Sequence, residues 1–230
     1  MWSPESGEGH LLPHDWEVPF NDYSADFEFA MDWHPSKPTA AIWTVTTRDG
    51  IIVYDELPPL PGDKTPGDLV EIFHQKEGYR FGRNKLRMKR YADPKMKDKS
   101  NVVIRGMNAW RMFQKEGLYL TEGYNRQPEV GISIINDFLR GDTTTHPRLF
   151  ILEHCTTLRK AMKEHYWRQN PDGTGKPDAR WSDYPICLRY ILQQRGKTKV
   201  GKRRKKWSLT SYGGDSLCYY PRQARLQRMR

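Results

Sequence analysis

The segment between residues 27 and 56 most constrains the fold, because it holds three short apolar runs separated by turn residues. The runs at residues 27–31, 40–46 and 51–56 are rich in β-branched and aromatic side chains, which favour strands. The turn "RDG" at residues 48–50 joins the last two runs, and an Asp-Gly turn between such runs favours a hairpin. The segment therefore predicts three antiparallel strands.

Helix and strand patterns alternate in the rest of the chain. Thr65 can cap a helix that has Pro66 at its first position and ends before Gly78. Apolar spacing predicts further helices at residues 101–116, 128–140, 156–169 and 183–192, and further strands at residues 86–92, 118–120 and 148–152. A three-stranded meander followed by alternating strands and helices predicts an α/β fold, with a mixed sheet flanked by helices.

Composition sets the expected limits of the domain. Residues 25–195 predict one compact domain, between an irregular arm or linker at residues 1–24 and a basic tail at residues 196–230. No apolar run approaches the roughly 20 residues of a membrane helix, and the N-terminus lacks the pattern of a secretory signal, so we expect a soluble chain with no membrane partner. A reducing compartment and no structural zinc are expected from the wide spacing of the three cysteines, Cys155, Cys187 and Cys218.

The charge of the chain favours a polyanion as partner. The formal net charge is +10, from 38 Lys and Arg against 28 Asp and Glu, and the basic segment after residue 196 contains no acid as far as Trp207. Each neutralised phosphate releases condensed counterions, so such a segment favours nucleic acid. The candidate DNA contacts are Lys95, Lys97 and Lys99 after Asp93, and Lys197, Lys199, Lys202, Arg203, Arg204, Lys205 and Lys206 in the tail. A solvated loop and a solvated or disordered tail are the alternatives.

Three aspartates occupy comparable places in this pattern. Asp32 ends the first strand, Asp93 ends the fourth in "RYADPK", and Asp183 opens the last helix. If those two strands are neighbours and the helix crosses their ends, the three carboxylates form a cluster that a divalent cation would relieve of repulsion. Carboxylate oxygens suit Mg²⁺ or Mn²⁺, and two such ions support phosphodiester hydrolysis. Each Asp alone is more commonly a turn residue or a helix cap.

His34, two residues after Asp32, is a further candidate for contact with a metal or a phosphate. A loop histidine before a proline is more often only a turn residue. His34 therefore stays a weaker candidate than the three aspartates.

Three stretches together, "MDWHPSKPTAAIWTVTTRDGIIVYDEL", "YADPK" and "SDYPICLRYIL", resemble the C-terminal nuclease domain of the large terminase subunit of tailed bacteriophages. The resemblance covers residues 25–193 and implies a ribonuclease H-like fold, two bound Mg²⁺ or Mn²⁺ ions and cleavage of concatemeric viral double-stranded DNA during genome packaging. It assigns metal binding to Asp32, Asp93 and Asp183, and matches Glu56 to an acid that often closes the third strand. Asp55 should point to the opposite face, since strand side chains alternate.

The chain also departs from the family pattern. Ile186 and Cys187 stand where family members commonly have a second acid, and no GxxxxGK[ST] phosphate-binding loop occurs, so the packaging ATPase is expected to be absent from this chain. The resemblance implies that ATPase domain, the portal ring and the small terminase subunit as further partners, in the cytoplasm of an infected bacterial host. Alternatives are another ribonuclease H-like nuclease, such as a Holliday-junction resolvase or transposase-like enzyme, and a noncatalytic module that docks DNA or the portal ring.

Overall fold

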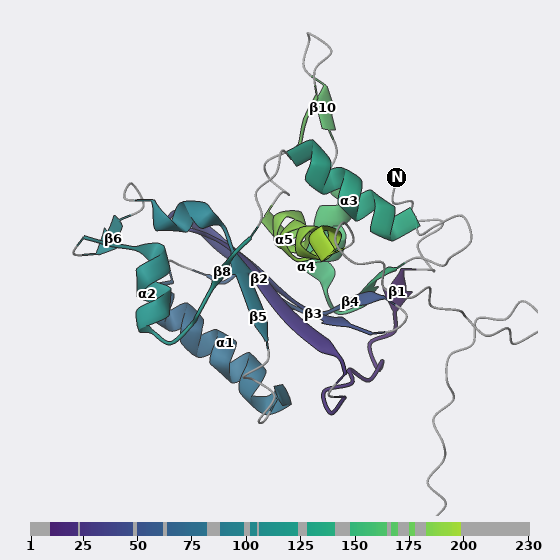
Figure 1. The fold of residues 1–230 in the computed structure, drawn as a ribbon, viewed down its shortest axis with the longest axis horizontal. Helices are drawn as coiled ribbons and strands as arrows, with labels where there is room; N and C mark the ends of the chain where they lie inside the picture. The colour runs from purple at the N-terminus through teal and green to yellow at the C-terminus, as the bar shows by residue number, and fades with distance from the viewer. Residues whose placement is uncertain are drawn as a thin grey trace, which may run out of the picture.

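A seven-stranded sheet forms the centre of the molecule (Figure 1). The computed structural model describes residues 10–22, 24–47, 50–61, 64–81, 88–98, 102–104, 106–123, 128–140, 148–164, 167–169, 175–177 and 183–198. The strands of the sheet are β1 (Leu11–Leu12), β2 (Asp26–His34), β3 (Lys37–Thr46), β4 (Ile51–Leu57), β5 (Lys89–Ala92), β8 (Thr121–Glu122) and β9 (Leu149–Leu152). They lie in the order β1-β9-β4-β3-β2-β5-β8.

The three strands expected from residues 27–56 are confirmed. β2 pairs with β3 and β3 pairs with β4, both antiparallel. Nearly every residue of β4 and of the middle of β2 and β3 is buried, as in sheets that carry helices on both faces. The Thr47 N–H donates to the carbonyl of Gly50 at 2.8 Å, while residues 48–49 of the expected turn lie outside the described residues.

The remaining strands of the sheet pair in parallel, which confirms the mixed sheet. β5 adds to β2 and β8 adds to β5, while on the other side β9 adds to β4 and β1 adds to β9. The strand expected at residues 118–120 is instead β8. Gly117 adopts φ +88°, and Leu118 turns into the core with its N–H donating to the Phe113 carbonyl at 2.9 Å, so pairing begins only at Thr121.

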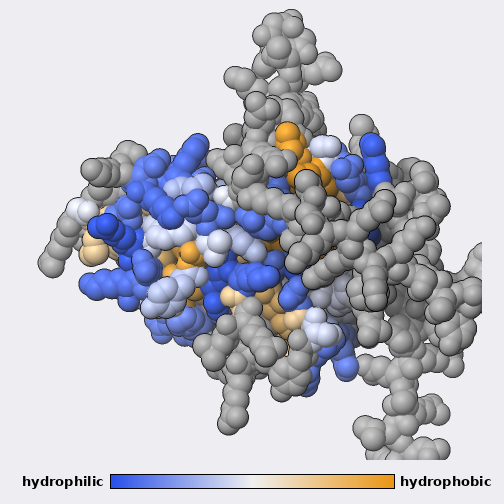
Figure 2. Space-filling view, viewed as in Figure 1, coloured by the Kyte–Doolittle hydropathy of each residue, from blue (hydrophilic) through white to orange (hydrophobic). Residues whose placement is uncertain are grey.

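Helices cover both faces of the sheet (Figure 1). One face carries α1 (Pro66–Phe81) and α2 (Ala109–Lys115), and the other carries α3 (Pro128–Arg140), α4 (Thr156–Glu164) and α5 (Asp183–Thr198). The hydrophobic core fills the space on both sides of the strands. In the view of Figure 2, hydrophilic residues dominate the described surface over α1 and α2.

Tertiary contacts make α1 longer than its sequence suggests. The predicted cap is present, since the Asp68 N–H donates to Thr65 Oγ1 at 3.2 Å. The expected end before Gly78 is wrong, because the helix continues to Phe81. Glu77, buried just before this glycine, accepts hydrogen bonds from Trp43 Nε1 at 3.2 Å and from Arg90 at 2.6 Å, and these contacts hold the C-terminal part of the helix on the sheet.

Two other predicted helices are too long. The helix expected at residues 101–116 begins only at Ala109, after β6 (Val102–Ile104) and β7 (Met107–Asn108) form a hairpin in which Gly106 adopts φ +76°. Asn108 then caps α2 by accepting the Arg111 N–H at 3.0 Å. The helix expected at residues 156–169 ends at Glu164, because β10 (Trp167–Gln169) pairs with β11 (Gly175–Pro177), a pairing across the segment "NPDGT" that helical spacing did not reveal.

The ends of the described chain bear on the expected domain limits. Within the expected arm, Leu11 and Leu12 form the edge strand β1, and Trp16, Val18 and Phe20 pack against the core. At the other end α5 runs to Thr198, and residues 199–230 lie outside the described residues. In the described part of the chain, no helix has the length and apolar character needed to cross a membrane.

Candidate active site

Asp32 and Asp93 lie next to each other at one edge of the sheet. β2 and β5 are parallel neighbours, with Met31 paired with Ala92, and each of these residues is followed directly by an aspartate. Adjacent strands in a sheet are about 4.8 Å apart. The expected adjacency of the first and fourth strands of the sequence pattern is therefore confirmed, and it brings the two aspartates together.

A tight turn holds Asp93 at this edge. Asp93 caps the short 3₁₀ helix η3 (Pro94–Lys97), and its side chain accepts the Lys95 N–H at 2.8 Å. The Asp-Pro-Lys sequence explains the turn, since Asp is a strong cap and proline suits the first helical position. Asp93 is thus a cap, and the same turn keeps its carboxylate beside the end of β2.

α5 brings Asp183 to the same edge. The helix begins at Asp183 and packs across β2, β3 and β5. One turn later Cys187 Sγ lies 3.5 Å from the carbonyl oxygen of Ala40, which is the β3 partner of Asp32. The Tyr184 hydroxyl donates to the carbonyl of Leu57, so the first turn of α5 is tied to β4 as well.

Electrostatics shows that the three carboxylates interact. The pKa of Asp32 is raised from 3.8 to about 7, first by burial and then by the negative charges of Asp183 and Asp93. Lys37 and Arg189 act in the opposite direction. The ionised form of Asp32 is therefore costly in the protein alone, and additional positive charge at this edge would favour it.

The donor set suits a hard divalent cation. Three aspartates supply the oxygen ligands that Mg²⁺ and Mn²⁺ prefer, and one of the three, Asp32, is destabilised in its charged form. Among the described residues, no three His, Cys, Asp or Glu side chains already stand in the arrangement of a metal cage. The interaction that the structure gives for these carboxylates is that of the charges of Asp183 and Asp93 with Asp32.

Glu56 shares a face of the sheet with Asp32 but has another partner. Its Oε1 accepts the Thr157 N–H and its Oε2 accepts the Leu158 N–H, each at 2.7 Å, so the carboxylate caps the N-terminus of α4. Asp55 points to the opposite face, as expected, and pairs with Lys76 at 2.8 Å. A metal ion at Glu56 would compete with two short hydrogen bonds, and its role as a ligand stays a prediction.

The basic residues expected to contact DNA fall into three groups: those in η3, one in α5, and those outside the described residues. Lys95 and Lys97 lie in η3 beside Asp93, where the Lys97 ammonium forms an ion pair with Glu122 and lies 4.4 Å from the centroid of the Trp110 ring. Lys197 lies in the last turn of α5. Outside the described residues are Lys99, Lys199, Lys202, Arg203, Arg204, Lys205 and Lys206.

Arg189 is a residue of this site that sequence reasoning missed. It is 8% exposed, its positive charge lowers the pKa of Asp32, and its Nε has no hydrogen-bond partner among the described residues. Gly131 of α3 gives it room, because a Cβ at that position would lie 1.9 Å from the Arg189 Cδ. A lone arginine inside the apolar run "ICLRYIL" was the available signal.

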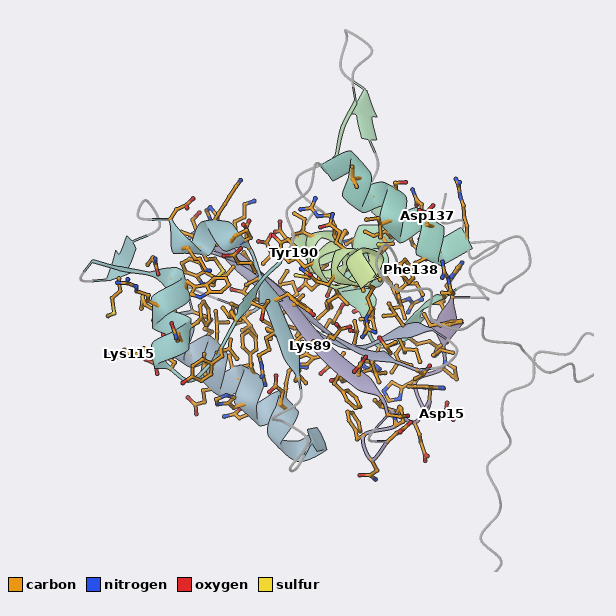
Figure 3. The ribbon with its side chains drawn as sticks, in the orientation of Figure 1. Asp15, Lys89, Lys115, Asp137, Phe138 and Tyr190 are labelled. Carbon is orange, nitrogen blue, oxygen red and sulfur yellow. The ribbon has the colours of Figure 1, made fainter. Side chains whose placement is uncertain are left out.

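Tyr190, the next residue, closes the site toward β8. Its side chain projects from α5 toward the edge formed by β5 and β8 (Figure 3). A Cβ on Gly123 would lie 2.6 Å from its ring, and the Gly123 N–H donates to the Ala92 carbonyl at 2.7 Å. Burial raises the pKa of Tyr190 well above its usual value, with the charges of Asp32 and Asp93 contributing, so this phenol stays protonated.

Known proteins resemble this chain in structure but not in sequence. No family model and no curated protein matches it. The large terminase from a thermophilic bacteriophage superposes with a TM-score of 0.64 at 13% identity, over 81% of this chain and 42% of that protein. The P22 large terminase nuclease domain superposes with a TM-score of 0.57 at 14% identity, over 82% of this chain and 89% of that domain.

The chain has the fold of a terminase nuclease domain. The ribonuclease H-like class expected from the sequence is thereby confirmed. The chain spans less than half the length of the thermophilic phage terminase and is similar to nearly all of the P22 domain. At 13–14% identity the likeness concerns the terminase nuclease fold alone, and the metal-binding roles of the three aspartates stay a prediction.

Proposed function

We propose that this chain is a metal-dependent endonuclease of the terminase type that cleaves concatemeric viral double-stranded DNA during genome packaging. The observation that carries the proposal is the meeting of Asp32, Asp93 and the start of α5 at one edge of a sheet with the terminase nuclease fold. The solved structures that superpose on this chain with TM-scores of 0.64 and 0.57 are a large terminase and a terminase nuclease domain, which favours this function over other nucleases.

The three aspartates would hold two Mg²⁺ or Mn²⁺ ions at the scissile phosphate. Such ions supply an activated water and stabilise the charge on the attacking and leaving oxygens. Asp32 would contribute its carboxylate in the ionised form, which the cations favour over the proton. Asp93 is oriented by the η3 turn, and Asp183 by the packing of α5 on β2 and β3.

DNA binding would depend on charge rather than on base contacts. Lys95 and Lys97 flank Asp93, and the basic tail adds charge beyond α5. Contacts to phosphates position a duplex without reading its sequence, so intrinsic sequence specificity should be low. The packaging ATPase domain, portal ring and small terminase subunit are the further partners we propose, with action in the cytoplasm of the infected bacterium.

Cleavage of plasmid DNA in Mg²⁺ or Mn²⁺ tests the proposal. The wild-type chain should nick and linearise the plasmid, and Asp32→Asn should lose this activity while its circular dichroism spectrum is unchanged. Asp137→Asn is the matched control, because Asp137 is exposed on α3 and should tolerate the same loss of charge with full activity (Figure 3).

Two results would contradict the proposal. Full cleavage by Asp32→Asn would exclude Asp32 from the mechanism. A wild-type chain that binds DNA but cuts nothing in either metal would instead indicate the noncatalytic docking module.

A further inference from the structure

A small cavity opens beside the candidate active site, between the turn that joins β2 to β3 and the start of α1. Its volume is about 180 Å³. None of the described residues that line it is acidic, and its polar lining consists of His34, Ser36, Lys37, Thr39 and Lys64. The cavity therefore presents cationic and hydrogen-bonding groups without an opposing carboxylate.

The cavity lies close to the aspartate cluster. His34 follows Asp32 by two residues and pairs with Lys37 across the hairpin. The charge of Lys37 reaches Asp32, since it lowers the pKa of that carboxyl. A group bound in the cavity would thus be a near neighbour of a group bound at the aspartates.

The lining offers donors that suit an oxyanion. The Ser36 N–H donates to His34 Nδ1 at 3.2 Å, which leaves the proton of the neutral imidazole on Nε2 as a donor. The ammonium groups of Lys37 and Lys64 form no ion pair with any described residue. The Ser36 hydroxyl lies 3.0 Å from the same Nδ1 and donates to it. The two ammonium groups, the imidazole N–H and the Thr39 hydroxyl remain, and groups of these kinds commonly bind phosphate.

We propose that this cavity binds a phosphate of the DNA backbone, on the strand whose neighbouring phosphate lies at Asp32, Asp93 and Asp183. The inference rests on the proposed nuclease function and adds a second phosphate site to it. A phosphate bound in the cavity would fix the position of the DNA strand along the protein. The scissile phosphate would then be held at the carboxylates by the contact that its neighbour makes with the cavity.

Binding of a fluorescent DNA duplex over a range of salt, in EDTA so that no cleavage occurs, tests the inference. The double variant Lys37→Gln/Lys64→Gln should bind more weakly and flatten the slope of log affinity against log salt by about 0.9, because one phosphate contact is lost. The matched control is Lys89→Gln/Lys115→Gln, which removes the same charge from the start of β5 and the end of α2 (Figure 3). The control should keep the wild-type slope.

The outcomes separate this inference from the proposed function. Equal slopes in the Lys37/Lys64 variant, the control and the wild type would overturn the cavity as a DNA site. Inorganic phosphate is the second probe. If the wild type and the control bind it saturably and the Lys37/Lys64 variant does not, while all three chains have equal salt slopes for DNA, the cavity binds free phosphate and not DNA. If the Lys37/Lys64 variant has the flatter salt slope but the wild-type chain never cuts plasmid in Mn²⁺, the cavity is supported as a DNA site and the nuclease function is contradicted. A wild-type chain that binds no DNA would remove both.

Discussion

Replacing Asp32 with asparagine should make the metal-free protein more stable at pH 8. In the folded protein the pKa of Asp32 is about 7, against 3.8 for an ordinary aspartate, because burial and the charges of Asp183 and Asp93 disfavour its ionised form. Below pH 3.8 the carboxyl is protonated in both the folded and the unfolded chain, and it contributes no pH dependence. Between pH 3.8 and 7 only the unfolded chain is ionised, so the free energy of unfolding falls as the pH rises, and above pH 7 the full cost of ionising the folded form remains.

The magnitude follows from the size of the shift. A difference of about three pKa units at 1.36 kcal/mol per unit is about 4 kcal/mol, which is an upper bound because Asp32 keeps some contact with water. We expect a gain of about 2 kcal/mol for Asp32→Asn at pH 8, and a gain near zero at the lowest pH at which the protein still folds.

Urea unfolding of both chains in EDTA at several pH values measures this gain. Adding Mn²⁺ at pH 8 should reverse the order, because a cation that binds the folded wild-type site stabilises it by mass action, and the variant has lost a ligand. A difference between the two chains that does not change from pH 5 to pH 8 would refute the reasoning, since the penalty at Asp32 would then not come from its charge.

Two further substitutions test the contacts around the site. Glu56→Gln should lower the free energy of unfolding by about 1–3 kcal/mol in urea, because the charged cap of α4 is lost, and should leave the affinity for Mn²⁺ unchanged; a weaker Mn²⁺ midpoint with unchanged unfolding would make Glu56 a metal ligand. Gly131→Ala should lower the melting temperature, at a cost of about 1–3 kcal/mol, because the new Cβ would overlap Arg189. Gly67→Ala is its control, since the nearest atom to that Cβ is 3.7 Å away, and a raised melting temperature in both variants would contradict the close packing at Arg189.

The sequence alone determined the helices and strands whose pattern is contained within their own residues. Alternating and β-branched residues predicted β2, β3 and β4, and apolar spacing predicted α3 at the residues where it occurs. The same reasoning placed Asp93 directly after a strand, as the structure has it, whereas the expected strand end at Asp32 is wrong, because pairing with β3 carries β2 on to His34. These parts could be predicted since a strand or helix period repeats within a few residues.

Only the tertiary structure decided which of these residues meet. Glu56 and its partner Leu158 are 102 positions apart, and nothing near either residue indicates that the carboxylate caps α4. Arg189 reaches the site because Gly131 on another helix leaves space for its side chain, and α1 continues past Gly78 because Trp43 and Arg90 hold Glu77. Contacts of this kind depend on how the helices pack on the sheet, and this packing is set by interactions throughout the core. A local sequence pattern therefore cannot predict them.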